Sequence, residues 1–223
     1  MKARISEIFD SIQGEGIYLG EKQIFVRFFG CNLSCSFCDT KINRFREYEP
    51  QQLLDQIKSY RGKYHSLSFT GGEPLLQKDF LKEFLKLASG QGYKNYLETN
   101  GTLSGELEYV IDYLDIIAMD LKLPSSTGMF SLWGMHRRFL KIASRKETFL
   151  KAIISHSTNE EDIKEALALI KDINKNTVLV LQPNSYEDQK LLQEKLEKFK
   201  DICTRETIAA CIIPQIHKKL GMR

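Results

Sequence analysis

The 223-residue sequence has few residues that interrupt or cross-link a chain, with only five prolines and five cysteines. No stretch rich in Pro, Gly and Ser marks a linker, so we expect one domain spanning residues 1–223. No apolar run approaches the ~20 residues needed to cross a bilayer, and charges interrupt the first residues. We therefore predict a cytoplasmic protein without membrane association. An odd number of cysteines also argues against a disulfide framework.

The sequence carries little net charge, because 32 Lys and Arg residues against 29 Asp and Glu give a formal charge of +3. This small excess predicts no nucleic-acid partner, since proteins that bind polyanions concentrate basic residues on one face. A local basic stretch from His136 to Lys146 is interpreted as a solvated face or as the lining of a pocket for one small anion.

Three of the cysteines lie close together, at Cys31, Cys35 and Cys38, in the spacing CxxxCxxC. Thiolates this close can converge on a soft-metal centre, and iron–sulfur clusters use them as ligands. Cys203 and Cys211 lie far downstream in no ligand motif, so we interpret them as packing residues. A four-iron cluster would then keep one iron without a protein ligand. There are three alternatives for these cysteines: a zinc site lacking a visible fourth ligand, a disulfide pair with a spare thiol, or buried apolar side chains.

Hydrophobic patterning predicts strands that alternate with helices. The predicted strands cover residues 4–10, as a short edge strand, and 24–29, 66–70, 93–99, 115–120, 149–155 and 177–181. The predicted helices begin near Pro50, Lys78, Glu106, Trp133, Asn159 and Ser185. Pro50 suits a first helical position, Asn159 can cap its helix, and Ser185 to Asp188 has the pattern of a capping box. The segment 127–146 is expected to be a loop with a helix over 133–143.

Six successive strand–helix units predict an α/β fold with a mostly parallel, curved sheet that forms a partial barrel. Ligands in such folds bind at the carboxyl ends of the strands. The segments at those ends are polar or glycine-rich, and they cover residues 30–40, 70–74, 98–101, 121–126 and 182–184. We therefore expect the functional site at this rim.

The cysteine motif with Phe37 before its last cysteine, followed one strand later by Gly71-Gly72-Glu73-Pro74, resembles the radical S-adenosylmethionine (SAM) superfamily. The resemblance implies a partial (β/α)6-type radical SAM barrel and a [4Fe–4S] cluster held by Cys31, Cys35 and Cys38. It also implies that SAM binds the open iron through its amino and carboxylate groups. The implied SAM contacts are Ser36, Phe37, Asp39, Gly72, Glu98, Lys122, Pro124, Ser125, Gln182, Pro183 and Asn184. At Gly72 a side chain would block the methionine end of SAM.

Further motifs resemble the 7-carboxy-7-deazaguanine synthase family. They are Gln13-Gly14-Glu15-Gly16, Arg27, Cys38-Asp39-Thr40, the stretch from Lys122 to Ser126, and Pro214-Gln215-Ile216-His217-Lys218. The resemblance implies a carbon–nitrogen lyase of the queuosine pathway. Such an enzyme converts 6-carboxy-5,6,7,8-tetrahydropterin to 7-carboxy-7-deazaguanine through a 5′-deoxyadenosyl radical, with loss of ammonia.

The same resemblance implies a magnesium ion on Thr40, an external one-electron reductant such as flavodoxin, and a homodimer. The implied contacts to the pterin substrate are Ile12, Gln13, Gly14, Glu15, Arg27, Thr70, His217 and Arg223. For Thr40 the simpler interpretation is a hydroxyl bonded to nearby backbone, and for His217 it is a surface histidine near the tail. Taken alone, the loop that contains Gln13-Gly14-Glu15-Gly16 is interpreted as a turn.

Arg27 stands in an otherwise apolar strand, where a charge needs a partner. A carboxylate of the substrate would satisfy its guanidinium through two parallel hydrogen bonds. An internal pair with an acidic side chain such as Glu73 is the alternative.

The sequence also allows two other functions. A radical SAM activating enzyme, which makes a glycyl radical on a partner protein, would suit the compact size but needs neither Arg27 nor Gln13-Gly14-Glu15-Gly16. A non-enzymatic iron–sulfur electron carrier would not need the glycine pair of Gly71-Gly72-Glu73-Pro74.

Overall fold

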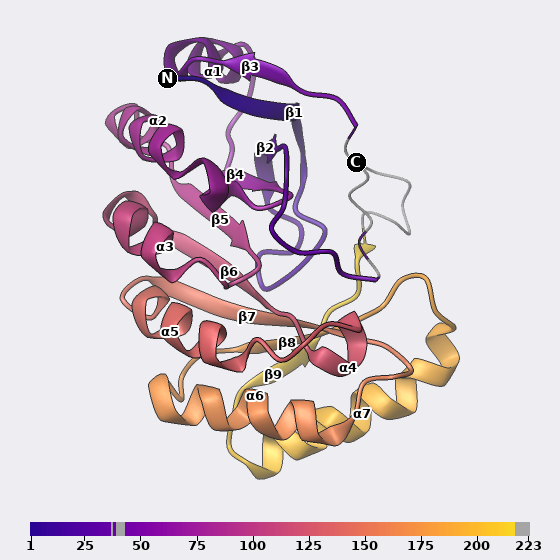
Figure 1. Cartoon of the computed structure of the whole chain (residues 1–223). Coiled ribbons are helices and arrows are strands. Elements are labelled where there is room, and N and C mark those ends of the chain that lie inside the picture. Colours follow the sequence, from indigo (N-terminus) through magenta and orange to yellow (C-terminus); the bar gives the residue numbers. More distant parts are fainter. Residues whose placement is uncertain (37, 39–42, 217–223) are drawn as a thin grey trace.

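The computed structural model describes residues 1–36, 38 and 43–216, and its strands form one nine-stranded sheet in the order β3-β1-β2-β4-β5-β6-β7-β8-β9 (Figure 1). The strands are β1 (Ala3–Ile12), β2 (Lys22–Phe28), β3 (Arg46–Tyr48), β4 (Ser66–Gly71), β5 (Asn95–Thr99), β6 (Ile116–Leu121), β7 (Glu147–Ile154), β8 (Leu179–Pro183) and β9 (Ala210–Ile212). Five predicted site residues lie outside the described ranges, namely Phe37, Asp39, Thr40, His217 and Arg223.

Helices follow the parallel strands and, except for the short α4, cover the outer, convex side of the curved sheet (Figure 1). They are α1 (Pro50–Lys58), α2 (Lys78–Gly90), α3 (Ser104–Val110), α4 (Pro124–Thr127), α5 (Trp133–Ala143), α6 (Glu160–Ile173) and α7 (Gln189–Arg205). None of the helices in the described part of the chain is both long and apolar enough to cross a membrane.

The predicted parallel units are confirmed, because β2, β4, β5, β6, β7 and β8 pair in parallel in sequence order. The prediction of an edge strand over 4–10 is wrong. β1 pairs antiparallel with β2 on one side and with β3 on the other, so β3 forms the edge. β3 and β9 were not predicted, since a three-residue strand contains too few positions to show an alternation.

The predicted helix starts agree with the structure to within two residues except at α7, and the short helix α4 was not predicted. Pro50 occupies the first helical position of α1, and the Asn159 side chain accepts a hydrogen bond from the Asp162 backbone N–H at 2.9 Å. The predicted capping box beginning at Ser185 is wrong. Asp188 is the N-cap of α7, and its carboxylate accepts from the backbone of Lys190 at 2.8 Å. The polar run before the helix forms a turn instead, because Asn184 donates to the Glu187 carboxylate at 2.9 Å.

The two faces of the sheet bury different side chains. Residues such as Phe28, Phe69 and Leu97 pack beneath the helices in the main core. A smaller apolar cluster lies on the inner face and consists of Tyr96, Ile116, Ala118, Phe149 and Val180.

Side chains two positions apart on a strand face the same side, so Glu98, Asp120, Lys151 and Gln182 follow this inner cluster toward the carboxyl ends. The inner face is therefore apolar at one end of the strands and polar at the other. The polar end is where the predicted site begins.

Candidate active site

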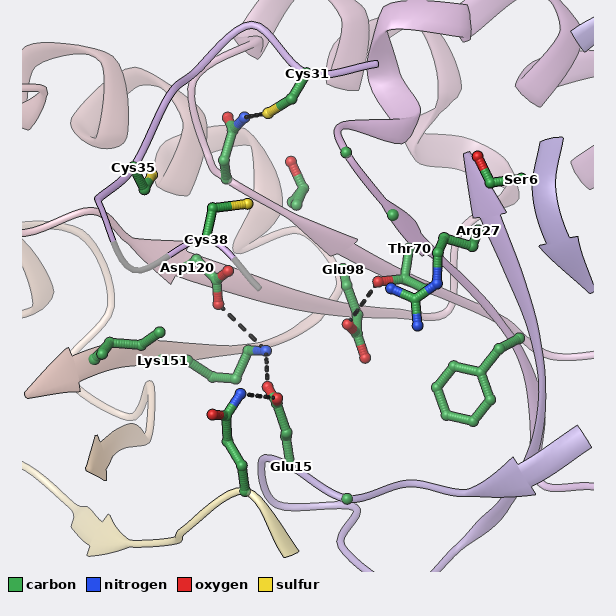
Figure 2. Close-up of a pocket in the computed structure, with 18 of the residues that line it drawn as sticks. Ser6, Glu15, Arg27, Cys31, Cys35, Cys38, Thr70, Glu98, Asp120 and Lys151 are labelled. Atoms are coloured by element: carbon green, nitrogen blue, oxygen red, sulfur yellow. Dashed lines mark hydrogen bonds and ion pairs between the residues drawn. The ribbon is translucent and has the colours of Figure 1, made fainter. Parts of the chain in front are cut away.

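A cavity of about 970 Å³ lies at the carboxyl ends of the parallel strands. Its wall includes Cys31, Cys35 and Cys38 on one side and Arg27 on the other, with Thr70 and Glu98 between them (Figure 2). The rim predicted from the strand order therefore forms one continuous cavity. It brings together the cysteine motif and the polar loop residues.

Most described residues among those predicted for the site line this cavity. They are Ile12, Gln13, Gly14, Glu15, Arg27, Cys31, Cys35, Cys38, Thr70, Gly72, Glu98, Lys122, Gln182 and Asn184. Four predicted SAM contacts, Ser36, Pro124, Ser125 and Pro183, are not part of its wall. Ser125 uses its hydroxyl and its backbone N–H to donate to the Asp162 carboxylate, which fastens α4 to α6.

The three cysteines of the motif are free thiols at the cavity. Burial raises the pKa of Cys35, nearby Lys122 opposes this shift, and the neighbouring Cys31 and Cys38 raise the pKa further. Across the described residues, no three His, Cys, Asp or Glu side chains are grouped tightly enough to hold one metal ion. The cysteines of a four-iron cluster bind separate irons, and the three thiols at one side of the cavity fit that role.

The Gly71-Gly72-Glu73 segment fastens β4 to the strand that leads into the cysteine loop. The backbone N–H of Gly72 donates to the Phe28 carbonyl at 3.1 Å, and that of Glu73 donates to the Gly30 carbonyl at 2.8 Å. A Cβ on Gly72 would lie 1.9 Å from the Gly30 carbonyl oxygen. The glycine is therefore required by backbone packing, in addition to any ligand that approaches it.

Arg27 does form an internal ion pair with an acidic side chain, as the alternative suggested, but its partner is Glu7 and not the fully buried Glu73. The Glu73 carboxylate accepts from the Asn100 backbone at 2.8 Å, from the Leu75 backbone at 3.1 Å and from the Thr99 hydroxyl at 3.0 Å. Burial raises the pKa of Glu73 to about 7, although these hydrogen bonds and Lys122 lower it.

Glu73 should make the stability of the protein depend on pH. Because its folded pKa of about 7 lies above the usual glutamate value of 4.5, its contribution is complete below pH 4.5 and is lost as pH rises through 7. We expect the loss to be roughly 3 kcal/mol in the free energy of unfolding. Between pH 4.5 and 7, the free energy of unfolding measured in urea should fall more steeply for the wild type than for Glu73→Gln. Parallel pH profiles of the two proteins would contradict the assignment.

The loop between β1 and β2 folds into the open side of the barrel. The Gln13 amide donates to the Glu98 carboxylate at 2.9 Å and to the Gln23 amide oxygen at 3.0 Å. Gly16 adopts a left-handed φ of 66°, and a Cβ there would lie 2.6 Å from the Phe149 ring. Gly16 is therefore explained by packing against Phe149, and Glu15 beside it reaches the cavity wall.

A buried charge network at the cavity was not predicted. Lys151 is 5% exposed, and its Nζ lies 2.9 Å from Glu15 Oε2 and 3.3 Å from Asp120 Oδ1 (Figure 2). Lys122 Nζ lies 2.8 Å from the other Asp120 oxygen, and Gln215 Nε2 donates to Glu15 Oε1 at 2.6 Å. The signal in the sequence was a single lysine within the apolar strand 149–155, the same pattern that marked Arg27.

The network keeps Lys151 and Asp120 charged. Burial lowers the pKa of Lys151, but Asp120 and Glu15 outweigh that effect and hold the pKa well above its usual value. Burial likewise raises the pKa of Asp120, yet Lys122 and Lys151 bring it below the usual range. The cavity floor therefore presents fixed charges at neutral pH.

Arg27 faces the cavity and has an acidic neighbour on β1. Its Nε donates to Glu7 Oε2 at 3.0 Å, and its Cζ lies 5.7 Å from the centre of the Phe9 ring. The Glu7 side chain is 48% exposed, so solvent screens this pair and its contribution to stability is small. Thr70, the register partner of Arg27 on β4, donates to the Glu98 carboxylate at 2.9 Å.

Among the described residues of the cavity wall, Gln182 has a buried side-chain oxygen without a hydrogen-bond donor. Its amide is 1% exposed, and its Oε1 accepts no hydrogen bond from any described residue. A buried acceptor left in this state is costly. A ligand that donates a hydrogen bond here would satisfy it, which fits the SAM contact expected at this position.

Comparisons with known proteins agree with this geometry. The Radical SAM superfamily profile matches residues 25–196. The 7-carboxy-7-deazaguanine synthase of Geobacter sulfurreducens is 35% identical, over 98% of this chain and 97% of its own length. The enzyme of that name from Methanothermobacter thermautotrophicus is 33% identical, over 100% and 99% of the two chains. The chain belongs to the 7-carboxy-7-deazaguanine synthase family of radical SAM enzymes.

Solved structures support the fold of this family. QueE from Escherichia coli superposes with a TM-score of 0.68, covering 95% of this chain and 93% of that chain at 21% sequence identity. Streptococcus suis SuiB matches with a TM-score of 0.61 over 82% of this chain. The predicted radical SAM barrel is thereby confirmed. Membership of the superfamily implies a [4Fe–4S] cluster and SAM, and the three thiols and the Gln182 acceptor fit both groups.

Proposed function

We propose that the protein converts 6-carboxy-5,6,7,8-tetrahydropterin to 7-carboxy-7-deazaguanine with loss of ammonia. The observation that carries this proposal is the single cavity in which Gln13, Glu15 and Arg27 face the cysteine motif. The relatives that match this chain along its whole length are named for this product. An activating enzyme acts on a partner protein and would need neither Arg27 nor the Gln13-Gly14-Glu15-Gly16 loop, whereas Arg27, Gln13 and Glu15 all line this cavity.

The protein's own residues would hold and orient the reactants. Cys31, Cys35 and Cys38 would bind the cluster, and Gln182 with Asn184 would contact SAM. When bound, the cluster and SAM supply a radical that removes a hydrogen atom from the substrate. Glu15, held by Lys151, would accept hydrogen bonds from the amino-pyrimidine end of the pterin, and Arg27 would bind its carboxylate.

A SAM-cleavage assay on anaerobically reconstituted protein tests this function. We expect reductive cleavage of SAM, with formation of 7-carboxy-7-deazaguanine only when 6-carboxytetrahydropterin is added. A glycyl-radical activating enzyme would cleave SAM without forming this product, and an electron carrier would not cleave SAM. Either result would overturn the proposal.

Replacing Arg27 tests the pterin pocket. We expect Arg27→Ala to weaken 6-carboxytetrahydropterin binding about tenfold to a hundredfold, because a charge-assisted hydrogen bond contributes about 1.5–3 kcal/mol. SAM affinity and iron content should stay near wild type. Arg27→Lys should restore binding only in part, since an ammonium group cannot make the two parallel bonds of a guanidinium. Equilibrium binding measurements with each ligand check both variants.

Glu7 provides the control for Arg27, because it is the acidic neighbour of the guanidinium. Glu7→Gln should leave pterin affinity within a factor of about three, since the pair is screened by solvent. If Arg27→Ala lowers the unfolding midpoint and leaves pterin affinity unchanged, the arginine serves the fold and the pocket is assigned wrongly.

We propose further that Thr40 binds Mg²⁺ together with the substrate. Mg²⁺ prefers oxygen ligands and keeps several waters, so one hydroxyl can suffice when the substrate supplies other oxygens. Thr40→Ala should raise the Mg²⁺ concentration needed for half-maximal turnover by about tenfold, while SAM cleavage without pterin persists. Thr40→Ser, which keeps the hydroxyl, is the matched control. Equal loss of the uncoupled cleavage in Thr40→Ala would indicate a structural role instead.

The reaction also needs an electron donor. We propose a one-electron reductant such as flavodoxin, and a homodimer as the assembled state. Turnover with a flavodoxin system in place of a chemical reductant tests the first, and sedimentation velocity tests the second.

A further inference from the structure

The loop that follows β5 holds the cysteine loop through a closed ring of side-chain hydrogen bonds. The Asn100 amide donates to Asn32 Oδ1 at 2.8 Å, the Asn32 amide donates to the Thr102 hydroxyl at 2.9 Å, and that hydroxyl donates to Asn100 Oδ1 at 2.6 Å. Asn100 and Thr102 are buried, at 5% and 7% exposed. Asn32 is the immediate neighbour of Cys31, so the ring fixes the backbone that carries the first cysteine.

Asn100 also reaches the sulfur itself. Its Nδ2 lies 3.9 Å from Cys31 Sγ, the contact drawn to Cys31 in Figure 2. An amide nitrogen has two hydrogens, so one can serve Asn32 while the other points to the sulfur. The Asn100 oxygen is occupied as well, because it accepts from the Thr102 backbone at 3.1 Å and from the Thr102 hydroxyl. Reversing the amide would put its oxygen against the Asn32 oxygen and the sulfur, so the network sets its orientation.

The backbone of Asn100 is anchored independently, since its N–H donates to the buried Glu73 carboxylate at 2.8 Å. One residue therefore connects the glutamate of the Gly71-Gly72-Glu73-Pro74 motif with the cysteine loop. The remaining donor to this sulfur in the described residues is the Leu33 backbone N–H, at 3.4 Å.

We propose that Asn100 is a positioning residue for the iron–sulfur cluster. Its side chain holds the Cys31 loop and donates a hydrogen bond to the Cys31 sulfur. The inference rests on the proposed function only in requiring a cluster on Cys31. Hydrogen bonds to the ligand sulfurs are one means by which a protein sets the reduction potential of its cluster. A donor here stabilises negative charge on the sulfur, and the reduced cluster carries more of that charge. Asn100 therefore raises the potential and eases reduction.

The test uses the full-length reconstituted protein and two readouts that need no substrate. Asn100→Asp keeps the size of the side chain and an acceptor for Thr102, but it replaces the donating amide by a carboxylate oxygen. We expect the same iron content as wild type, a more negative midpoint potential in an EPR-monitored redox titration, and several-fold faster iron release to a chelator. Asn176→Asp makes the same change of charge at an exposed position and should leave both values unchanged.

Two more variants separate the donor from the loop. Asn100→Ser removes the amide without adding charge, so its potential should also fall, by less than in Asn100→Asp. Thr102→Val opens the ring but leaves the Asn100 amide, so iron release should accelerate while the potential changes little. If Asn100→Asp does not take up iron, the midpoint potential of Asn100→Ser tests the proposal in its place.

A wild-type potential in a fully loaded Asn100→Ser protein would overturn the role of Asn100. A wild-type protein that assembles no cluster would overturn the proposed function together with this inference. Normal cluster loading of the wild type and of Asn100→Ser, with the same potential in both, would overturn the role of Asn100 and leave the proposed function standing.

Discussion

Replacing Cys35 by alanine is expected to abolish assembly of the four-iron cluster, with iron falling to background and the reduced-cluster EPR signal absent. The physical reason is that the structure offers a cluster only three thiols at the cavity, so the loss of one leaves two irons without a protein ligand. Cys35 is the half-buried member of the three, and its pKa is coupled to the other two thiols. Iron analysis after anaerobic reconstitution measures the effect.

The remaining cysteines provide the controls. Cys203 is fully buried in the main core, and Cys211 packs at the edge of the inner cluster. We expect Cys203→Ala and Cys211→Ala to keep the iron content of the wild type, although Cys203→Ala removes a buried sulfur and should lower the unfolding midpoint. Loss of cluster in either control would show that the ligand set extends beyond the motif.

The fold could be predicted because its signals are local. Six apolar stretches each end in glycine or polar residues, and helices with apolar residues at helical spacing separate them. Right-handed crossovers then limit the parallel strands to a few arrangements. The errors lie where the local signal is weak. β3 and β9 have three residues each, and whether residues 4–10 form an edge depends on β3 pairing beside them.

The candidate site was predictable where it follows strand ends and less so where distant segments meet. The cysteines, Gly72, Thr70 and Glu98 all belong to loops or strand ends that the strand order brings together. The contact of Lys151 with Glu15 spans 136 residues, and that of Gln215 with Glu15 spans 200. No spacing rule relates such positions. They meet because the loop between β1 and β2 folds inward, which depends on the packing of Gly16 against Phe149.

The Asn100 ring was missed for a different reason. The sequence marks residues 98–101 only as a polar segment at a strand end, and Glu98-Thr99-Asn100-Gly101 has the composition that turns commonly have. What distinguishes this turn is its burial beneath the cysteine loop, which composition does not reveal. A run of several hydrogen-bonding side chains immediately after a buried strand was the available signal.

Lys151→Met is expected to destabilise the protein strongly and to weaken pterin binding. Lys151 lies between two carboxylates, whose side chains are only 16% exposed for Glu15 and 27% exposed for Asp120. Removing one partner of a buried ion pair leaves a charge without compensation and costs about 3–5 kcal/mol. Glu15 would then lose the ammonium group at its Oε2 while the Gln215 amide still holds its Oε1, so its orientation toward the substrate would loosen.

Urea unfolding under anaerobic conditions measures the stability change, and Lys141→Met is the matched control because Lys141 is exposed on α5. The control should change the free energy of unfolding by no more than about 0.5 kcal/mol. Adding Glu15→Gln to Lys151→Met removes the uncompensated carboxylate, so the double variant should regain part of the lost stability but none of the pterin affinity. Equal stabilities of Lys151→Met and the double variant would mean that Glu15 does not depend on Lys151. In that case the lysine acts on Asp120, and the Asp120–Lys122 pair would be the next one to test.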